Sequence, residues 1–130
     1  EQYIKTVVIE MGIMRTMLWE GILPAISRQL HLEQSTLSSL PEEIAKESVL
    51  WKKSIADLAS VKNGLIGASE KLDALLGKIH DAEVEDQSKM ITEEALPLYA
   101  HIRALSDRAE TLTAKDIWPY PTYTRLLSIS

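Results

Sequence analysis

The stretch SLPEEIAKESVLWKKSIADLASVKNGLIGASEKLDALLGKIHD, residues 39–81, decides the fold of this chain. Apolar side chains recur in it every seven residues, at Ile44, Trp51, Leu58, Leu65, Leu72 and Ile79. Further apolar residues flank this seam at Ile55, Val61, Ala68, Leu75 and Leu76. A seven-residue repeat keeps apolar side chains on one face of an α-helix. We therefore expect one long amphipathic helix over about residues 40–81.

The start of this helix carries a signal of its own. Ser39 is followed three residues later by Glu42, with Pro41 between them, which is typical of a capping box at a helix N-terminus. The glycines of the stretch each lower helix propensity by about 1 kcal/mol relative to alanine. The apolar period continues across them, so packing against other helices must stabilise this one.

The residues before this stretch predict another helix, over about residues 2–31. Its apolar residues alternate in steps of three and four: Ile4, Val7, Met11, Met14, Leu18, Gly21 and Ala25. Pro24 interrupts the pattern, and we expect a kink there because proline removes a backbone donor. No N-cap residue precedes Ile4, which indicates that the repeat is already in progress and the chain is a fragment of a longer one. The serine-rich residues between Leu30 and Pro41 are expected to form a loop.

A third helix is expected over about residues 86–115, after an acidic turn at 81–86. Its apolar stripe is Ile91, Ala95, Leu98, Ile102, Leu105, Ala109 and Leu112, with a kink expected at Pro97. Residues 116–130 follow as an extended aromatic tail, because each proline in it disfavours helix in the residue before it. No alternating strand pattern occurs. The sequence predicts an all-α, up-down-up bundle of three long, partly kinked helices with this extended C-terminal tail, forming one domain over residues 1–130.

Composition excludes several classes of protein. The chain has 130 residues, 45% of them hydrophobic and 25% charged, as in a folded globular domain. Its net charge of -5 disfavours nucleic acid and anionic membranes as partners. It has no cysteine, which excludes disulfides, thiolate metal sites and a cysteine nucleophile. Charged residues interrupt every apolar region before it is long enough to span a membrane.

The three histidines give no clear catalytic or metal site. A di-iron bundle site needs a glutamate three residues before a histidine, but Arg28, Gly77 and Leu98 stand at those positions. His101 on a bundle helix resembles a phosphotransfer histidine, but Leu105 occupies the place of the small residue that this role needs. No phosphate-binding loop and no paired nucleophile and base occur either. We therefore expect no catalytic, cofactor-binding or metal-binding residue in this chain.

The densest acidic cluster surrounds the second turn. It comprises Asp81, Glu83, Glu85, Asp86, Glu93 and Glu94. Such a cluster could bind a hard cation or a basic partner, but its spacing is not that of a calcium loop. A solvated turn is the favoured interpretation.

Two features of the last third form a candidate docking surface. Arg103, Asp107 and Glu110 share one stripe of the predicted helix, beside the apolar seam, where they could pair with each other or with another domain. The tail adds Trp118, Tyr120 and Tyr123, whose large apolar surfaces are costly to leave in water. The tail either folds over its own bundle or docks onto a neighbouring domain or subunit.

These residues also carry a family resemblance. Ile9-Glu10, Ile22-Leu23-Pro24-Ala25, Leu96-Pro97 with the Arg103 stripe, and the ending Trp118-Pro119-Tyr120-Pro121-Thr122-Tyr123 resemble the C-terminal helical region of type III glutamine synthetase. The C-terminal group is the specific part. The sequence departs from the family at Tyr99, where Met is usual, and after Leu127, where Ser128-Ile129-Ser130 replaces a terminal Phe.

The resemblance implies a parent enzyme that joins ammonia to glutamate at the expense of ATP, with a divalent metal such as Mg, in a large cytoplasmic homo-oligomer. The ATP, metal and substrate residues of that family lie on a catalytic domain upstream of this region. The chain would then be a helical domain with a structural, oligomer-stabilising or regulatory role, packed on the catalytic domain or between subunits. The alternative is a freestanding helical-bundle module for protein–protein interaction, with a groove for a partner helix.

Overall fold

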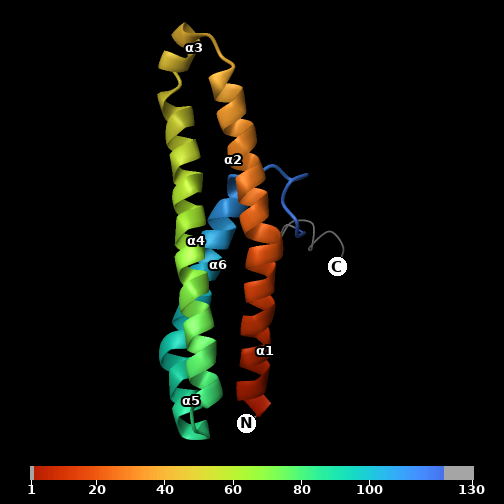
Figure 1. Cartoon of the computed structure of the whole chain (residues 1–130), viewed down its shortest axis with the longest axis vertical. Helices are drawn as coiled ribbons and strands as arrows, with labels where there is room; N and C mark the ends of the chain where they lie inside the picture. Colours follow the sequence, from red (N-terminus) through yellow and green to blue (C-terminus); the bar gives the residue numbers. More distant parts are fainter. Residues whose placement is uncertain (1, 122–130) are drawn as a thin grey trace.

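Apolar residues at helical spacing form helices along nearly the whole chain in the computed structural model, which describes residues 2–121 (Figure 1). The chain begins with α1 (Gln2–Met17), continues through a π-helical turn η1 (Leu18–Ile22) into α2 (Leu23–Ser38), and reverses at the short α3 (Glu42–Lys46). Helix α4 (Val49–Asp81) returns along it. Helix α5 (Val84–Met90), a second π-helical turn η2 (Ile91–Ala95) and α6 (Leu96–Thr111) complete the described helices. The all-helical prediction is confirmed, with no strand within residues 2–121.

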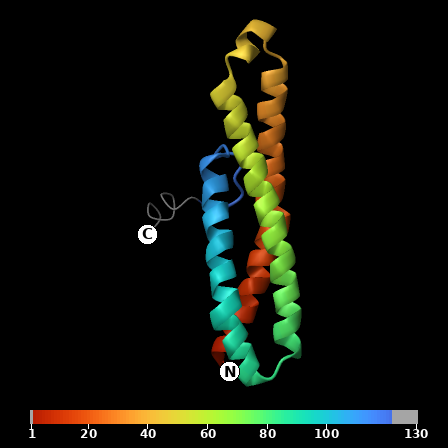
Figure 2. The same cartoon turned by 90° about the vertical axis from the view of Figure 1, so that its left-hand side faces the viewer.

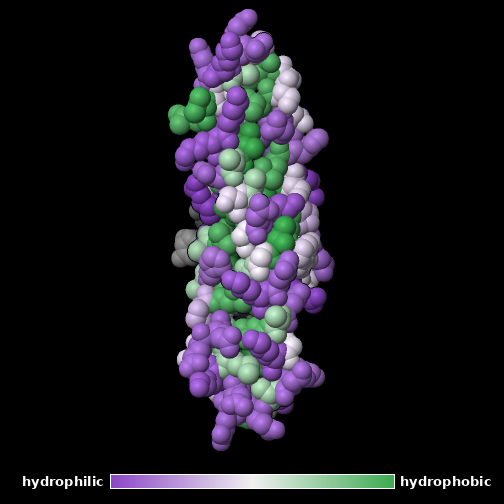
Figure 3. Space-filling model, turned by 60° about the vertical axis from the view of Figure 1, so that its left-hand side comes forward, coloured by the Kyte–Doolittle hydropathy of each residue, from purple (hydrophilic) through white to green (hydrophobic). Residues whose placement is uncertain are grey.

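The helices pack side by side as an elongated bundle in which α4 contacts α1, α2, α5 and α6 (Figures 1 and 2). Helix α6 ends part-way along α4, so the corner made by the end of α2, α3 and the start of α4 extends beyond it. Large apolar side chains are exposed at this corner, including Ile44, Val49 and Leu50, and Figure 3 shows hydrophobic residues at the surface near it.

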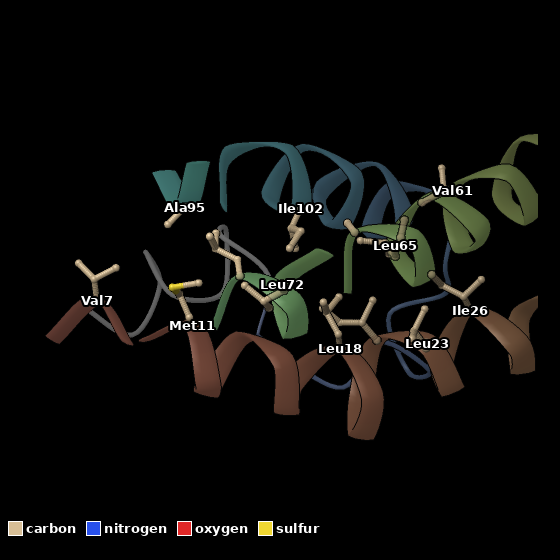
Figure 4. Packing of buried hydrophobic residues seen from close by; sticks show 14 of the residues in the cluster. Val7, Met11, Leu18, Leu23, Ile26, Val61, Leu65, Leu72, Ala95 and Ile102 are labelled. Atoms are coloured by element: carbon tan, nitrogen blue, oxygen red, sulfur yellow. The ribbon is translucent and has the colours of Figure 1, made fainter. Parts of the chain in front are cut away.

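The core runs along the seam predicted from residues 39–81. Leu58, Leu65, Leu72 and Ile79 of α4 are almost fully buried in one hydrophobic cluster. Figure 4 shows two of them, Leu65 and Leu72, between residues of the neighbouring helices. The partners contributed by the other helices include Met11, Leu18, Ile26, Ile91 and Ile102. The first two members of the seam differ, because Trp51 is half-buried and Ile44 is exposed in α3.

The predicted end of the first helix, near residue 31, is wrong. Helix α2 continues to Ser38, and its hydroxyl residues do not break it, because a hydroxyl such as Thr36 Oγ1 donates back to the Leu32 carbonyl at 2.7 Å. The predicted loop is therefore shorter, and the residues after Ser38 form the corner.

The predicted capping box is also wrong. The Ser39 hydroxyl donates to the Thr36 carbonyl at 2.7 Å, and Pro41 is the residue that caps α3, without a side-chain hydrogen bond. Helix α3 then ends at Lys46, and α4 begins at Val49 after the non-helical Ser48. The single helix expected over 40–81 is thus two helices, because the chain must still reverse its direction after the longer α2.

Neither Pro24 nor Pro97 ends its helix. Each lies in the first turn of an α-helix, directly after a π-helical turn. Leu23 and Leu96, the residues before these prolines, donate their N–H groups five residues back, to the Leu18 and Ile91 carbonyls. The kinks at the two prolines stay a prediction. The last helix spans 84–111 rather than 86–115, since Leu112 already leaves helical geometry.

Within residues 2–121, no helix combines the length and the hydropathy that a membrane span requires.

Candidate docking site

A pocket of about 300 Å³ lies between α1, α6 and the segment that follows α6. Its apolar walls come from the end of α1 and the π-helical turn η1 on one side and from α6 on the other. Trp118, Tyr120 and Pro121, from the segment after α6, complete the lining. Figure 4 shows Leu18 and Ile102, two residues of its floor, pointing from opposite helices into the bundle interior. The residues around it are: Met14, Met17, Leu18, Ile22, Ile102, Arg103, Ser106, Asp107, Glu110, Trp118, Tyr120 and Pro121.

Tyr120 is attached to the first long helix at the π-helical turn. Its hydroxyl donates a hydrogen bond to the Met17 carbonyl at 3.2 Å, next to the point where i→i−5 bonding begins. Its ring lies against Gly21, where a β-carbon would collide with it. The sequence pattern placed Gly21 in the apolar stripe, but the position needs glycine because of this close approach.

A second attachment holds the start of the same segment. The Ala114 N–H donates to Gln29 Oε1 at 3.0 Å, and Gln29 Nε2 donates to Glu33 Oε1 at 2.8 Å. The Trp51 indole N–H bonds to the other oxygen of Glu33. The buried Gln29 therefore joins α2, α4 and the segment after α6. Sequence reasoning missed it, although a glutamine beside an apolar stripe is a signal that could have been tested.

The charged stripe predicted on α6 lies at the mouth of the pocket. Arg103, Asp107 and Glu110 all line it, and none of the three forms an ion pair with any residue of the described range 2–121. The mutual pairing that their spacing allows does not occur among these three residues in the described range. Other charged residues do pair, as Arg15 does with Asp73 at 2.5 Å.

Burial, and to a smaller extent nearby carboxylates, raise the pKa values of Tyr99 and Tyr120. Burial raises the pKa of Tyr120 above its ordinary value, and the negative charge of Glu20 raises it further. Burial likewise raises the pKa of Tyr99, Glu10 adds to the effect and Arg103 opposes it. The Tyr99 hydroxyl donates to the Glu10 carbonyl at 3.3 Å, which links α6 to α1 beyond the pocket.

The structure thus brings five of the six predicted docking residues to one pocket: Arg103, Asp107, Glu110, Trp118 and Tyr120. Trp118 and Tyr120 are half-buried against their own bundle. Tyr123, the sixth, lies outside the described residues. Whether this surface docks onto another protein stays a prediction.

The remaining candidates lie elsewhere on the surface. His31, His80 and His101 are exposed, as are the acids around the turn between α4 and α5. The described part of the chain contains no group of three or more His, Asp or Glu side chains that could hold a metal ion. What the pocket offers chemically is binding: apolar walls with charged side chains at the mouth.

Comparison with known proteins gives no match, whether to a family model, to a curated protein or to a solved structure.

Proposed function

We propose that this chain is the C-terminal helical domain of a type III glutamine synthetase, and that it docks onto the catalytic domain or a neighbouring subunit through the surface around the pocket. Its role is to stabilise the cytoplasmic homo-oligomer or to regulate it. ATP and the divalent metal would bind on the catalytic domain, so no catalytic residue is assigned here.

One observation carries the proposal. Some of the residues that resemble the family are far apart in sequence yet border one pocket: Ile22, the Arg103 stripe, and Trp118, Tyr120 and Pro121. Ile9-Glu10 and Leu96-Pro97 do not line it. Residues that serve only their own local helices would not need to converge. Their convergence supports a shared role of these segments at one surface.

The first experiment is the size of the native polypeptide, detected in cell extract with an antibody against this chain. The proposal expects a band several times heavier than 14.6 kDa. A band near 14.6 kDa would contradict it and favour the freestanding interaction module.

The second experiment tests the docking role in the full-length enzyme. Deleting Trp118–Ser130 removes both pocket-lining aromatics, whereas deleting only residues 122–130 leaves them in place. We expect the longer deletion to weaken the oligomer, measured by light scattering after size exclusion, more than the shorter one. Unchanged assembly and unchanged synthetase activity after the longer deletion would refute the docking role.

A specific feature also favours the alternative. The corner at α3 exposes Leu50 at 82% and Val49 at 67%, well away from the pocket. A freestanding module could use such apolar side chains to bind a partner. Replacing both residues by serine would then abolish partner binding, while changes at the pocket would not.

A further inference from the structure

The interior of the pocket is built to surround a slender side chain. Met14 and Met17 contribute flexible thioethers, and Trp118 and Tyr120 contribute aromatic surface. A volume of about 300 Å³ is at the lower limit of ligand pockets and is too small for a helix. The pocket therefore suits one inserted side chain rather than a broad apolar surface.

The mouth of the pocket is mainly acidic. Asp107 and Glu110 line it from α6, and Glu20, on the π-helical turn, lies close enough to Tyr120 to raise the pKa of its hydroxyl. None of these carboxylates has an ion-pair partner among the residues that the structure describes. Arg103 is the one basic side chain in the lining. It is one helical turn from Asp107 and two from Glu110, and it forms an ion pair with neither.

We propose that this pocket accepts a basic side chain, arginine in preference to lysine, presented by the protein segment onto which the chain docks. The aliphatic stem would lie along the two methionines, and the planar guanidinium would stack on the aromatic wall and pair with Asp107 and Glu110. A neutral apolar side chain would leave these carboxylates without a partner, and an acidic one would be repelled by them. The inference rests on the docking role proposed above, but not on the identity of the parent enzyme.

The test uses the 130-residue chain and small probes, followed by NMR of its indole N–H groups. The probes are N-acetyl-arginine methylamide, the neutral N-acetyl-norleucine methylamide and the anionic N-acetyl-glutamate methylamide. Trp118 reports on the pocket, while Trp19 and Trp51 bond to Ser69 and Glu33 elsewhere and serve as internal controls. We expect the arginine probe alone to shift the Trp118 signal, saturating at about millimolar concentration.

A pair of matched variants tests the carboxylates. Changing Asp107→Asn together with Glu110→Gln should lower the affinity for the arginine probe by about tenfold. The same changes at Glu83 and Asp86, exposed acids with the same spacing at the α4–α5 turn, should leave its affinity unchanged. Thermal unfolding followed by circular dichroism checks that both double variants remain folded.

Several outcomes would overturn the proposal. Equal binding of the norleucine probe would mean an apolar pocket without charge selection, and tighter binding of the glutamate probe would mean an anion site at Arg103. No shift at Trp118 with any probe would mean that the pocket binds no side chain.

One basic residue of the chain, Arg125, follows the pocket-lining Pro121 by four positions. If the arginine probe binds only to a chain that ends at Pro121, then Arg125 is the occupant and the proposal of a partner segment is wrong. Probe binding together with a native band of 14.6 kDa would uphold the pocket and refute the synthetase assignment. A heavier band without probe binding would support the synthetase assignment and refute the proposed arginine pocket.

Discussion

Tyr120 packs against the bare backbone of Gly21, so closely that a β-carbon added at Gly21 would lie 2.8 Å from Cζ of the ring. The contact joins the segment after α6 to the first π-helical turn, across about a hundred residues of sequence. The aromatic wall of the pocket therefore depends on the absence of a side chain in another helix.

Gly21→Ala should displace Tyr120 from its position against the first π-helical turn. Alanine normally stabilises a helix by about 1 kcal/mol over glycine, but here the clash with Tyr120 should cost about 1–3 kcal/mol. We expect a lower free energy of unfolding in urea and a red-shifted Trp118 emission, read in a chain whose other tryptophans are replaced by phenylalanine. Gly67→Ala is the matched control, because its added methyl group meets no atom within 4 Å, and it should stabilise the chain. Equal effects of the two changes would show that the Tyr120 contact does not form.

Ser69→Ala should destabilise the packing of α1 and η1 on α4. The Trp19 indole N–H donates to Ser69 Oγ at 2.6 Å, and Ser69 is fully buried. Loss of this acceptor should lower the free energy of unfolding by about 1 kcal/mol, since the half-exposed indole can partly turn to water. Ser60→Ala on the exposed face of α4 should change the free energy of unfolding by no more than a few tenths of a kcal/mol. A loss at Ser60 as large as at Ser69 would contradict the expectation.

Gln29→Leu should remove the attachment of the segment after α6 to α2. The change leaves the Ala114 N–H without its acceptor and removes the donor to Glu33, at a cost of about 1–3 kcal/mol. We expect faster hydrogen exchange at the Ala114 amide together with the lower stability. Gln34→Leu is the control, because exposed Gln34 bonds only weakly to Ser38, at 3.4 Å. Unchanged exchange at Ala114 in the Gln29 variant would exclude Gln29 as its anchor.

Alkaline pH should destabilise the bundle through Tyr99 and Tyr120. Burial raises the pKa of both hydroxyls in the folded state, so the unfolded state loses these protons first as the pH rises above the ordinary value of about 10. Their contribution is therefore complete below pH 10 and is lost as the pH rises through the folded pKa values. Urea unfolding between about pH 9 and 11 should show this fall, and Tyr99→Phe with Tyr120→Phe should reduce it. Tyr3→Phe, on the exposed face of α1, should leave the slope unchanged, and a slope insensitive to the double change would disprove this origin.

The helical character of the chain and most of its core could be predicted from residue spacing. Leu58, Leu65, Leu72 and Ile79 are buried as their seven-residue repeat indicates, because each α-helix presents its residues with a fixed period. The ends of the helices were predicted less well. Ser39 and Glu42 match a capping box, but the hydroxyl has a competing helical carbonyl at Thr36, and local pattern does not decide between them.

The candidate site could be predicted only in part. The spacing of Arg103, Asp107 and Glu110 places them on one stripe, and the proline-rich ending singles out Trp118 and Tyr120. Nothing in the spacing indicates that the two groups meet, or that Gly21 and Gln29 hold them together. The contact between Tyr120 and Gly21 joins residues about a hundred positions apart. The hydrogen bond from Ala114 to Gln29 joins residues 85 positions apart.

By itself, then, the sequence determined the periodic elements: that most of residues 2–111 form helices, and which face of α4 is buried. Only the tertiary structure decided where the chain turns, that Tyr120 lies on Gly21, and that three charged residues of α6 remain without ion-pair partners among the described residues beside an apolar pocket. The physical reason is range. Helix periodicity arises from bonds between residues three to five positions apart, whereas the pocket arises from packing between segments that only the folded chain brings together.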